Sequence, residues 1–231
     1  MKKKLVILTG AGISAESGLA TFRGMGGLWN GYKVTDVASP QGFRKNPELV
    51  LNFYNFRRKD AAKAQPNAAH HALLHLEEQY DTTIITQNVD DLHERAGSTK
   101  VLHLHGKLRE ARSTTASEQV FDINDRDINL GDLCPLGSQL RPNIVWFGEE
   151  VPLIPRAIDY CLTGDIFIVI GTSLAVYPAA SLINYVPESS PKYVIDPNIP
   201  SIPSYIKNVY ARSGKASQEV PILVAELLGR L

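Results

Sequence analysis

The sequence contains few cysteines, no excess of either charge and no long apolar run. Only two of its 231 residues are cysteines, Cys134 and Cys161, and the apolar run after the N-terminal lysines ends at Leu8, too early for a signal peptide. We therefore expect a reducing, cytoplasmic setting without structural disulfides. Lysine plus arginine equals aspartate plus glutamate at 24 each, so we expect no nucleic-acid partner. No stretch approaches about 18 apolar residues, so we expect no membrane span and no membrane partner.

What the sequence does contain predicts an α/β fold with a mostly parallel, Rossmann-like sheet flanked by helices and a small inserted domain. The length allows one large domain with a substantial core. Helices are expected over 47–63, from 66–67 to just before 81, and over 218–228. Short apolar runs typical of strands recur between the helical patterns, at 5–8, 82–86, 101–104, 143–147, 165–170, 192–195 and 208–211.

Two segments depart from this pattern. Gly24–Pro40 is rich in glycine and aromatic residues without periodicity, which predicts a mobile loop over a site. Lys107–Pro142 is polar and weakly patterned, which predicts a small inserted module.

The most informative stretch is the apolar run Lys4–Leu8, which leads into a glycine turn with Ser14 placed to cap a helix. Gly10 and Gly12 allow the backbone to approach a pyrophosphate closely, and helix-terminal N–H groups favour its negative charge. The spacing meets the dinucleotide-binding fingerprint only loosely, because Ala15 occupies the third glycine position. A tight strand–helix connection without a ligand remains the alternative.

Polar residues also follow later predicted strands, at the edge where open α/β sheets bind ligands. Thr86–His93 contains Asn88 and Asp90, which could bind a ligand or only cap the next helix. His103 and His105 share one face by the two-residue period of a strand, with His105 at the open end. For His103 a satisfied core position is the better interpretation, and no neighbouring ligand pattern completes a His-x-His metal pair. The turns at 171–173 and 196–198 follow further strands.

Six motifs stand in the order found in sirtuins and together span nearly the whole chain. They are Gly10–Ser14, Thr21–Arg23, Thr86–Asp90, His105–Gly106, Trp146–Glu149 and Gly171–Ser173. The chain therefore resembles sirtuins, which remove acyl groups from protein lysines while consuming NAD. The resemblance implies a single catalytic domain over 1–231 with the active site in a cleft between a large and a small part. The large part would comprise about 1–23, 81–106 and 143–231, and the small-domain insertions about 24–80 and 107–142.

The resemblance also implies roles for individual residues. His105, Asn88 and Asp90 would be catalytic. A strand that pairs with the substrate peptide through main-chain bonds would comprise Val145, Trp146, Phe147, Gly148 and Glu149. NAD would be bound by Gly10, Ala11, Gly12, Ile13, Thr21, Phe22, Arg23, Trp29, Gln87, Asn88, Val89, Asp90, Gly171, Thr172, Ser173, Asp196, Pro197, Asn198 and Ala216.

In the mechanism that the resemblance implies, the acyl carbonyl oxygen attacks the anomeric ribose carbon as nicotinamide leaves. His105 then accepts a proton from a ribose hydroxyl, a task suited to a side chain that titrates near neutral pH. The products would be free lysine, nicotinamide and O-acyl-ADP-ribose. The expected partners are acyl-lysine proteins or peptides.

One pair of residues narrows the expected acyl group. Tyr54 and Arg57 lie three apart on the predicted 47–63 helix, so their side chains share a face. The local sequence resembles the pair with which class III sirtuins read acidic acyl groups. A guanidinium binds a carboxylate bidentately, which predicts succinyl- and malonyl-lysine as substrates, with acetyl-lysine also accepted. The alternative is a surface arginine beside a core tyrosine.

The small domain departs from the family pattern. Most sirtuins hold a structural zinc ion there through two cysteine pairs. Between residues 108 and 140 only Cys134 remains, Ser113 stands near an expected cysteine position, and no histidine follows Gly106. One thiolate cannot complete a tetrahedral site, so we expect NAD as the only cofactor and no zinc. Three carboxylates could hold a hard cation, although such turns are usually only solvated: Asp122, Asp125 and Asp127.

Two other functions remain open. One is NAD-dependent ADP-ribosyl transfer, in which another nucleophile attacks the same ribose carbon. The other is a non-catalytic module that binds NAD or ADP-ribose. The complete set of His105, Asn88 and Asp90 favours deacylation over both.

Overall fold

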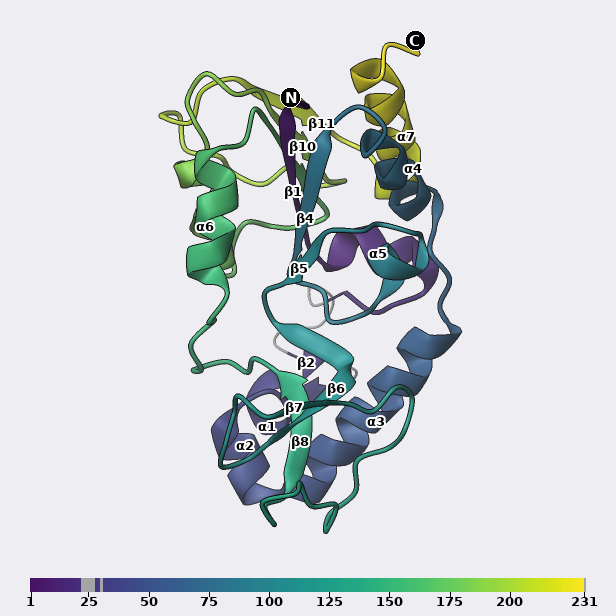
Figure 1. Cartoon of the computed structure of the whole chain (residues 1–231), viewed down its shortest axis with the longest axis vertical. Coiled ribbons are helices and arrows are strands. Elements are labelled where there is room, and N and C mark those ends of the chain that lie inside the picture. The colour runs from purple at the N-terminus through teal and green to yellow at the C-terminus, as the bar shows by residue number, and fades with distance from the viewer. Residues whose placement is uncertain (22–27, 30, 231) are drawn as a thin grey trace.

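A six-stranded parallel sheet forms the centre of the larger part of the molecule (Figure 1). The computed structural model describes residues 1–21, 28–29 and 31–230. The strands lie in the order β11–β10–β9–β1–β4–β5, the order of a Rossmann-type sheet, which confirms the predicted fold class. Their bounds are β1 Lys4–Thr9, β4 Asp81–Thr86, β5 Val101–His103, β9 Ile166–Ile170, β10 Lys192–Ile195 and β11 Val209–Arg212.

Helices cover both faces of this sheet. Leu5 and Ile7 of β1 belong to one buried cluster with α4 (Ala68–Leu76) and α7 (Ala216–Leu227). The alternating residues Val6 and Leu8 belong to a second cluster with α6 (Ile154–Leu162) and η2 (Ala179–Tyr185), on the opposite face. Coverage on both sides explains why the central strands β1 and β9 are almost continuously apolar rather than alternating. None of the helices in the described ranges combines the length and apolar character that crossing a membrane needs.

The smaller part of the molecule lies below this sheet in Figure 1. An antiparallel sheet with the order β7–β6–β8 packs there against α3. The elements are β2 Leu28–Trp29, β3 Tyr32–Lys33, α1 Val34–Val37, α2 Pro40–Lys45, α3 Pro47–Lys63, β6 Gly106–Ser113, β7 Val120–Asp122 and β8 Leu140–Ile144. Helix α4 lies within the range expected for the small insertion but packs with α7 on the large sheet (Figure 1).

Helix α3 begins as its local signals predict. The Asn46 side chain accepts a hydrogen bond from the backbone N–H of Leu49 (3.0 Å), and Pro47 and Glu48 occupy the first turn. Proline suits this turn because its missing N–H would have no partner there, and the carboxylate favours the positive end of the helix dipole.

Other expectations differ from the structure. The strand expected over 143–147 ends at Ile144, and it belongs to the small antiparallel sheet rather than to the parallel one. In the segment 24–40, residues 24–27 and 30 lie outside the described residues, and the rest contains the β2–β3 hairpin and α1 in place of an irregular loop. The module expected over 107–142 is built on β6, β7 and β8.

Candidate active site

Four loops meet at the carboxyl edge of the parallel sheet, after β1, β4, β5 and β9. These strands are neighbours in the order β5–β4–β1–β9. The chain extends from β1 to one side through β4 and later adds β9 on the other side, so the direction of winding reverses at β1. Open α/β sheets bind ligands in the crevice outside such a switch point. The structure therefore brings the predicted site segments together.

The glycine turn after β1 packs directly against the turn after β9. The N–H of Gly10 donates to the Ile170 carbonyl (3.0 Å), and that of Gly12 donates to the Gly171 carbonyl (2.8 Å). A Cβ on Gly12 would lie 2.5 Å from the Gly171 Cα, and one on Gly10 would lie 2.7 Å from the Thr172 Cβ. From the sequence we expect glycines here because a pyrophosphate must approach the backbone. In the structure glycine is also needed because the loop after β9 packs directly against this turn.

Ser14 does not cap a helix, so that expectation is wrong. The segment after the turn is a 3-10 helix, η1 (Ala11–Ser17), whose N-cap residue makes no side-chain hydrogen bond. The buried Ser14 hydroxyl instead donates to Asp90 Oδ2 (3.2 Å) and accepts from Asn88 Nδ2 (3.1 Å). Ser14 thus joins the first loop to the loop after β4. Nothing in the neighbouring sequence signals this role.

The loop after β4 presents its polar side chains to these neighbours. Gln87 Nε2 donates to Thr172 Oγ1 (3.0 Å), which links the loop to the turn after β9. Asp90 is buried, and burial raises the pKa of its carboxyl group. Its Oδ1 accepts from the backbone N–H of Leu92 at the start of α5 (Leu92–Arg95), so this carboxylate supports a helix and contacts Ser14 at the same time.

His105 lies at the junction of β5 and β6 with a defined proton position. Its Nδ1 lies 3.0 Å from the Gln87 carbonyl oxygen. Because a carbonyl can only accept, Nδ1 carries the proton, and in the neutral imidazole Nε2 keeps its lone pair. Burial lowers the pKa of the ring below its ordinary 6.5. His105 is therefore a neutral imidazole near pH 7, with Nε2 able to accept a proton.

His103 is buried and fully paired, as the core interpretation predicts. Its ring nitrogens lie 3.1 Å from the Asn88 carbonyl oxygen and 2.8 Å from Glu94 Oε1. Neither nitrogen is left to bind a metal ion together with His105, so the His-x-His alternative does not match this geometry.

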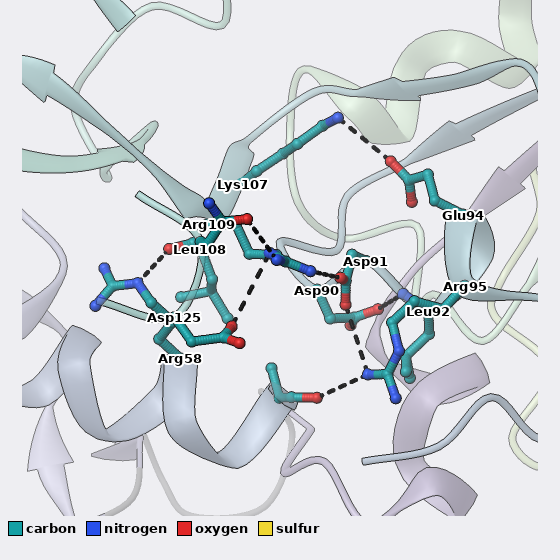
Figure 2. A network of polar contacts seen from close by, with 12 residues as sticks. Arg58, Asp90, Asp91, Leu92, Glu94, Arg95, Lys107, Leu108, Arg109 and Asp125 are labelled. Carbon is teal, nitrogen blue, oxygen red and sulfur yellow. Dashed lines mark hydrogen bonds and ion pairs between the residues drawn. The ribbon is translucent and has the colours of Figure 1, made fainter. Parts of the chain in front are cut away.

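The small part of the molecule is tied to the same loop by charged groups. Arg109 of β6 donates to Asp91 Oδ2 (3.0 Å), and its Nε lies 4.0 Å from Asp125. Arg95 lies 3.7 Å from the other Asp91 oxygen and donates to the Ala61 carbonyl at the end of α3. Figure 2 shows this network converging on Asp91, directly beside Asp90. The network therefore joins three separate elements behind the site.

The segments expected at the adenosine half follow β9 and β10. Asp196, at the end of β10, is buried, and its Oδ1 accepts from the backbone N–H of Asn198 (2.9 Å). Ala216 is buried at the first turn of α7 and packs near Ile195 in the same cluster. The carboxyl end of β10 and the start of α7 are thus close in space, beside the turn at Gly171.

Tyr54 and Arg57 lie one turn apart on α3. The Tyr54 hydroxyl accepts from Trp146 Nε1 (3.1 Å), and burial raises its pKa to about 12 although the Arg57 charge opposes the shift. Burial lowers the pKa of the Arg57 guanidinium from 12.5 to about 10, while Tyr54 and Asp90 act in the opposite direction. Asp90, in the loop after β4, is thus one of the charges that act on this guanidinium.

The segment Val145–Glu149 forms a tight turn after β8 rather than an extended strand. The N–H groups of Val145 and Phe147 donate to the carbonyls of His105 and Ala38, both at 3.0 Å, and Gly148 has a φ of 90°. Phe147 is 47% exposed, whereas Trp146 is buried. The main-chain N–H groups of Val145 and Phe147 are therefore already paired within the chain.

Glu149 holds this turn together from inside. Its carboxylate accepts from Arg141 (2.7 and 3.0 Å), Arg112 (3.0 Å) and the backbone N–H of Trp146 (2.8 Å). Burial would raise the pKa of Glu149, but the hydrogen bond from Arg141 and the other contacts lower it more. The Arg141 guanidinium also lies 3.3 Å from the centroid of the Trp146 ring. Glu149 thus shapes the turn instead of presenting its carboxylate to a ligand.

Hydroxyl groups surround Cys134, the cysteine that lies in the segment where the resemblance led us to look for zinc ligands. Ser138 Oγ lies 2.7 Å from Ser113 Oγ and 3.1 Å from Cys134 Sγ. The hydrogen bond with Ser138 is the largest cause that lowers the Cys134 pKa to about 7, and the backbone N–H of Leu136 contributes. One thiol with two serine hydroxyls does not fit a tetrahedral zinc site, which needs four strong nitrogen, sulfur or carboxylate ligands.

The nearby aspartates each have a separate partner. Asp122 accepts from the backbone N–H of Asn124, and Asp127 pairs with Lys59 at 2.6 Å. Across the described ranges, no group of three or more histidine, cysteine, aspartate or glutamate residues is arranged to hold a metal ion.

Some predicted site residues lie partly or wholly outside the part of the chain that the structure describes. Phe22 and Arg23 are not among the described residues, and for Trp29 only the backbone in β2 is described. Thr21 is half-buried without regular structure. Val89 accepts at its carbonyl from the N–H of Leu108 (2.8 Å), a further bond between the loop and β6.

Comparisons with known proteins agree with this fold. The chain matches the Sir2 family over residues 10–178 and belongs to that family. The NAD-dependent protein deacylase of Helicobacter pylori (strain J99) is 55% identical over 195 residues, covering 84% of this chain and 83% of that protein. The NAD-dependent protein deacylase of Vibrio cholerae is 46% identical over 236 residues, covering 98% and 94%.

Solved structures show the same fold. A Sir2 homologue in complex with NAD is 43% identical, with a TM-score of 0.88 over 99% of this chain and 90% of that one. A serine-to-alanine mutant of a Sir2 homologue in complex with ADP-ribose is also 43% identical, with a TM-score of 0.90 and coverages of 99% and 93%.

Proposed function

We propose that this NAD-dependent protein deacylase of the Sir2 family removes succinyl and malonyl groups from protein lysines, and acetyl groups as well. The observation that carries the acyl preference is the placement of Tyr54 and Arg57 one turn apart on α3, with both polar groups desolvated. Desolvation makes the charged guanidinium less stable than it is in water, as its lowered pKa indicates. A substrate carboxylate bound there would stabilise this buried charge.

The residues at the switch point suit NAD as the co-substrate. A glycine turn without bulky side chains follows the central strand, and amide, hydroxyl and carboxylate groups converge beside it from Gln87, Asn88, Ser14 and Asp90. We assign the pyrophosphate to Gly10–Ile13. The nicotinamide half is assigned to Gln87, Asn88 and Asp90, and the adenosine half to the turn at 171–173, Asp196–Asn198 and Ala216.

His105 supplies the base in this proposal. Its Nδ1–H is held by the Gln87 carbonyl, so Nε2 is left to accept a proton from a ribose hydroxyl. The acyl oxygen has by then displaced nicotinamide from the anomeric carbon, and the ribose hydroxyl attacks the acyl carbon. A water molecule adds at that carbon as its bond to the lysine nitrogen breaks, so free lysine and O-acyl-ADP-ribose are released. The exposed Phe147 and the turn Val145–Glu149 border the expected path of the peptide.

The test uses three peptides that differ only in the acyl group of one lysine: acetyl, succinyl or malonyl. Mass spectrometry after incubation with and without NAD should show NAD-dependent loss of each group and the matching O-acyl-ADP-ribose, with kcat/KM higher for the acidic groups. Acyl loss without NAD would refute the proposal. ADP-ribose attached to the peptide would favour ADP-ribosyl transfer instead.

His105→Ala serves as the catalytic variant in the same assay. Turnover should fall by about two orders of magnitude or more, because a positioned general base contributes that much, while NAD binding measured by calorimetry is retained. His75→Ala is the matched control, since that ring is exposed and pairs with Glu78 on the surface. Normal turnover of His105→Ala would remove this histidine from the proposed role.

A further inference from the structure

His103 is a buried histidine with an acceptor at each ring nitrogen. Nδ1 lies 3.1 Å from the Asn88 carbonyl oxygen, and Nε2 lies 2.8 Å from Glu94 Oε1. A carbonyl oxygen can only accept. The ammonium group of Lys107 lies 3.3 Å from the same Glu94 oxygen, which keeps that carboxylate ionised and therefore also an acceptor (Figure 2). Both ring nitrogens thus face acceptors, and a proton on each would satisfy both contacts.

The charges around His103 are consistent with this state. Glu94 of α5 carries the compensating charge. Burial would raise the pKa of Glu94, yet the hydrogen bond from His103 helps to lower it to about 2. Asp90, in the loop after β4, is a second acidic group: burial raises its pKa, and the interaction with His103 lowers it in part. His93 also faces this region, but burial lowers its pKa to about 3, so it stays neutral. Lys107 is a further cation, and it contacts Glu94.

We propose that His103, held as the imidazolium by Glu94, is a positioning residue that fixes the backbone of Asn88 for catalysis. This inference rests on the proposed function, since Asn88 and Asp90 are the groups expected to bind the nicotinamide ribose. The Asn88 backbone is fastened on both sides: its N–H donates to Thr86 Oγ1 (3.0 Å), and its carbonyl accepts from His103. Its side chain then meets Ser14 at 3.1 Å.

A second histidine after β5, His105, holds the carbonyl group of the residue before Asn88. His105 binds the Gln87 carbonyl with Nδ1, as His103 binds that of Asn88. The two histidines therefore hold successive peptide groups of one loop but differ in the environment of Nε2. Burial keeps His105 neutral with Nε2 available, whereas Glu94 occupies Nε2 of His103. The segment 103–105 thus sets both the position of the base His105 and that of the loop after β4.

Three substitutions of His103 distinguish the effect of its hydrogen bond to Asn88 from that of its hydrogen bond to Glu94. The amide nitrogen of His103→Asn can replace Nδ1 and still donate to Asn88. His103→Gln places its amide near Glu94 and loses the bond to Asn88, and His103→Leu loses both. We expect kcat on an acetyl-lysine peptide to stay within about threefold for asparagine and to fall about tenfold to a hundredfold for glutamine and leucine. The KM for the peptide should change little.

The melting temperature of each variant separates positioning from general stability. A structural role would make activity follow stability, with asparagine no better than glutamine, and that result would overturn the proposal. The nitrogen chemical shifts of His103 in the intact wild-type protein at pH 7.5 give an independent readout. Two protonated nitrogens are expected, and one unprotonated nitrogen would refute the imidazolium. If the wild type itself shows no NAD-dependent turnover, the proposed function fails, whereas the ring protonation is still measured.

Discussion

Replacing Arg57 by methionine should separate acidic from neutral acyl substrates. The methionine keeps much of the apolar stem that packs along α3 but removes the cation of the proposed acyl-reading pair. We expect kcat/KM on succinyl-lysine to fall by about a hundredfold. Activity on acetyl-lysine should stay within about threefold, because that group has no charge for the guanidinium to bind.

The size of the effect follows from the environment of the side chain. Burial lowers the pKa of the Arg57 guanidinium from 12.5 to about 10. A difference of this size corresponds to about 3 kcal/mol of unfavourable free energy for the charged form. A carboxylate that binds the guanidinium bidentately offsets most of this penalty in the complex. About 3 kcal/mol is roughly a hundredfold in kcat/KM.

The assay compares succinyl- and acetyl-peptides of the same sequence under kcat/KM conditions. Lys59→Met is the matched control, since it also replaces a cation of α3 by methionine, but Lys59 is exposed and pairs with Asp127 on the surface. The control should retain the wild-type ratio of the two activities. Equal losses of Arg57→Met on both peptides would show that Arg57 supports the fold or NAD binding rather than the acyl group, and the reasoning would be refuted.

Three further outcomes are expected. The acid limb of kcat/KM should have its midpoint below pH 6.5 and fall tenfold per pH unit below it. The reason is that His105 must be unprotonated to act as the base, and burial lowers its pKa. A pH–rate profile with its midpoint above 6.5 would contradict this. Strong chelators should leave the melting temperature and the activity unchanged, since Cys134 and its serine neighbours cannot complete a zinc site; one tightly bound zinc per chain, lost together with stability, would disprove it. Glu149→Gln should cost about 3 kcal/mol in urea unfolding, because Arg141 would lose its buried charge partner, and a change below about 1 kcal/mol would count against that pairing.

The parallel sheet and its ligand edge could be predicted because their signals are local. Each strand such as Leu5–Leu8 is a short apolar run, and parallel connections bring the carboxyl ends together without further information. The cap and proline of the 47–63 helix are likewise neighbours in the sequence. The segment Pro40–Lys45 had a comparable signal, because Ser39 caps α2 by accepting from the backbone N–H of Gly42, but it stands beside a glycine-rich stretch that obscures it.

The remaining features depend on contacts between distant residues. Ser14 and Asp90 are 76 positions apart, so nothing near Ser14 indicates that it binds a carboxylate rather than capping a helix. Glu149 lies beside the expected peptide site, but its carboxylate is already hydrogen-bonded to Arg141, eight positions earlier in the sequence. The protonation of His103 depends on Glu94 and a loop carbonyl, which no periodicity can show.

The contact between Gly12 and Gly171 has a consequence for how fast and how tightly NAD can bind. Each loop is already fixed by the other through a 2.8 Å hydrogen bond. Ordering a free backbone costs about 1–2 kcal/mol per residue, so a flexible phosphate loop would give up much of its binding free energy to that ordering. In the proposed site the loop is therefore preorganised before the dinucleotide arrives, and we expect association not to wait for a slow rearrangement of the loop.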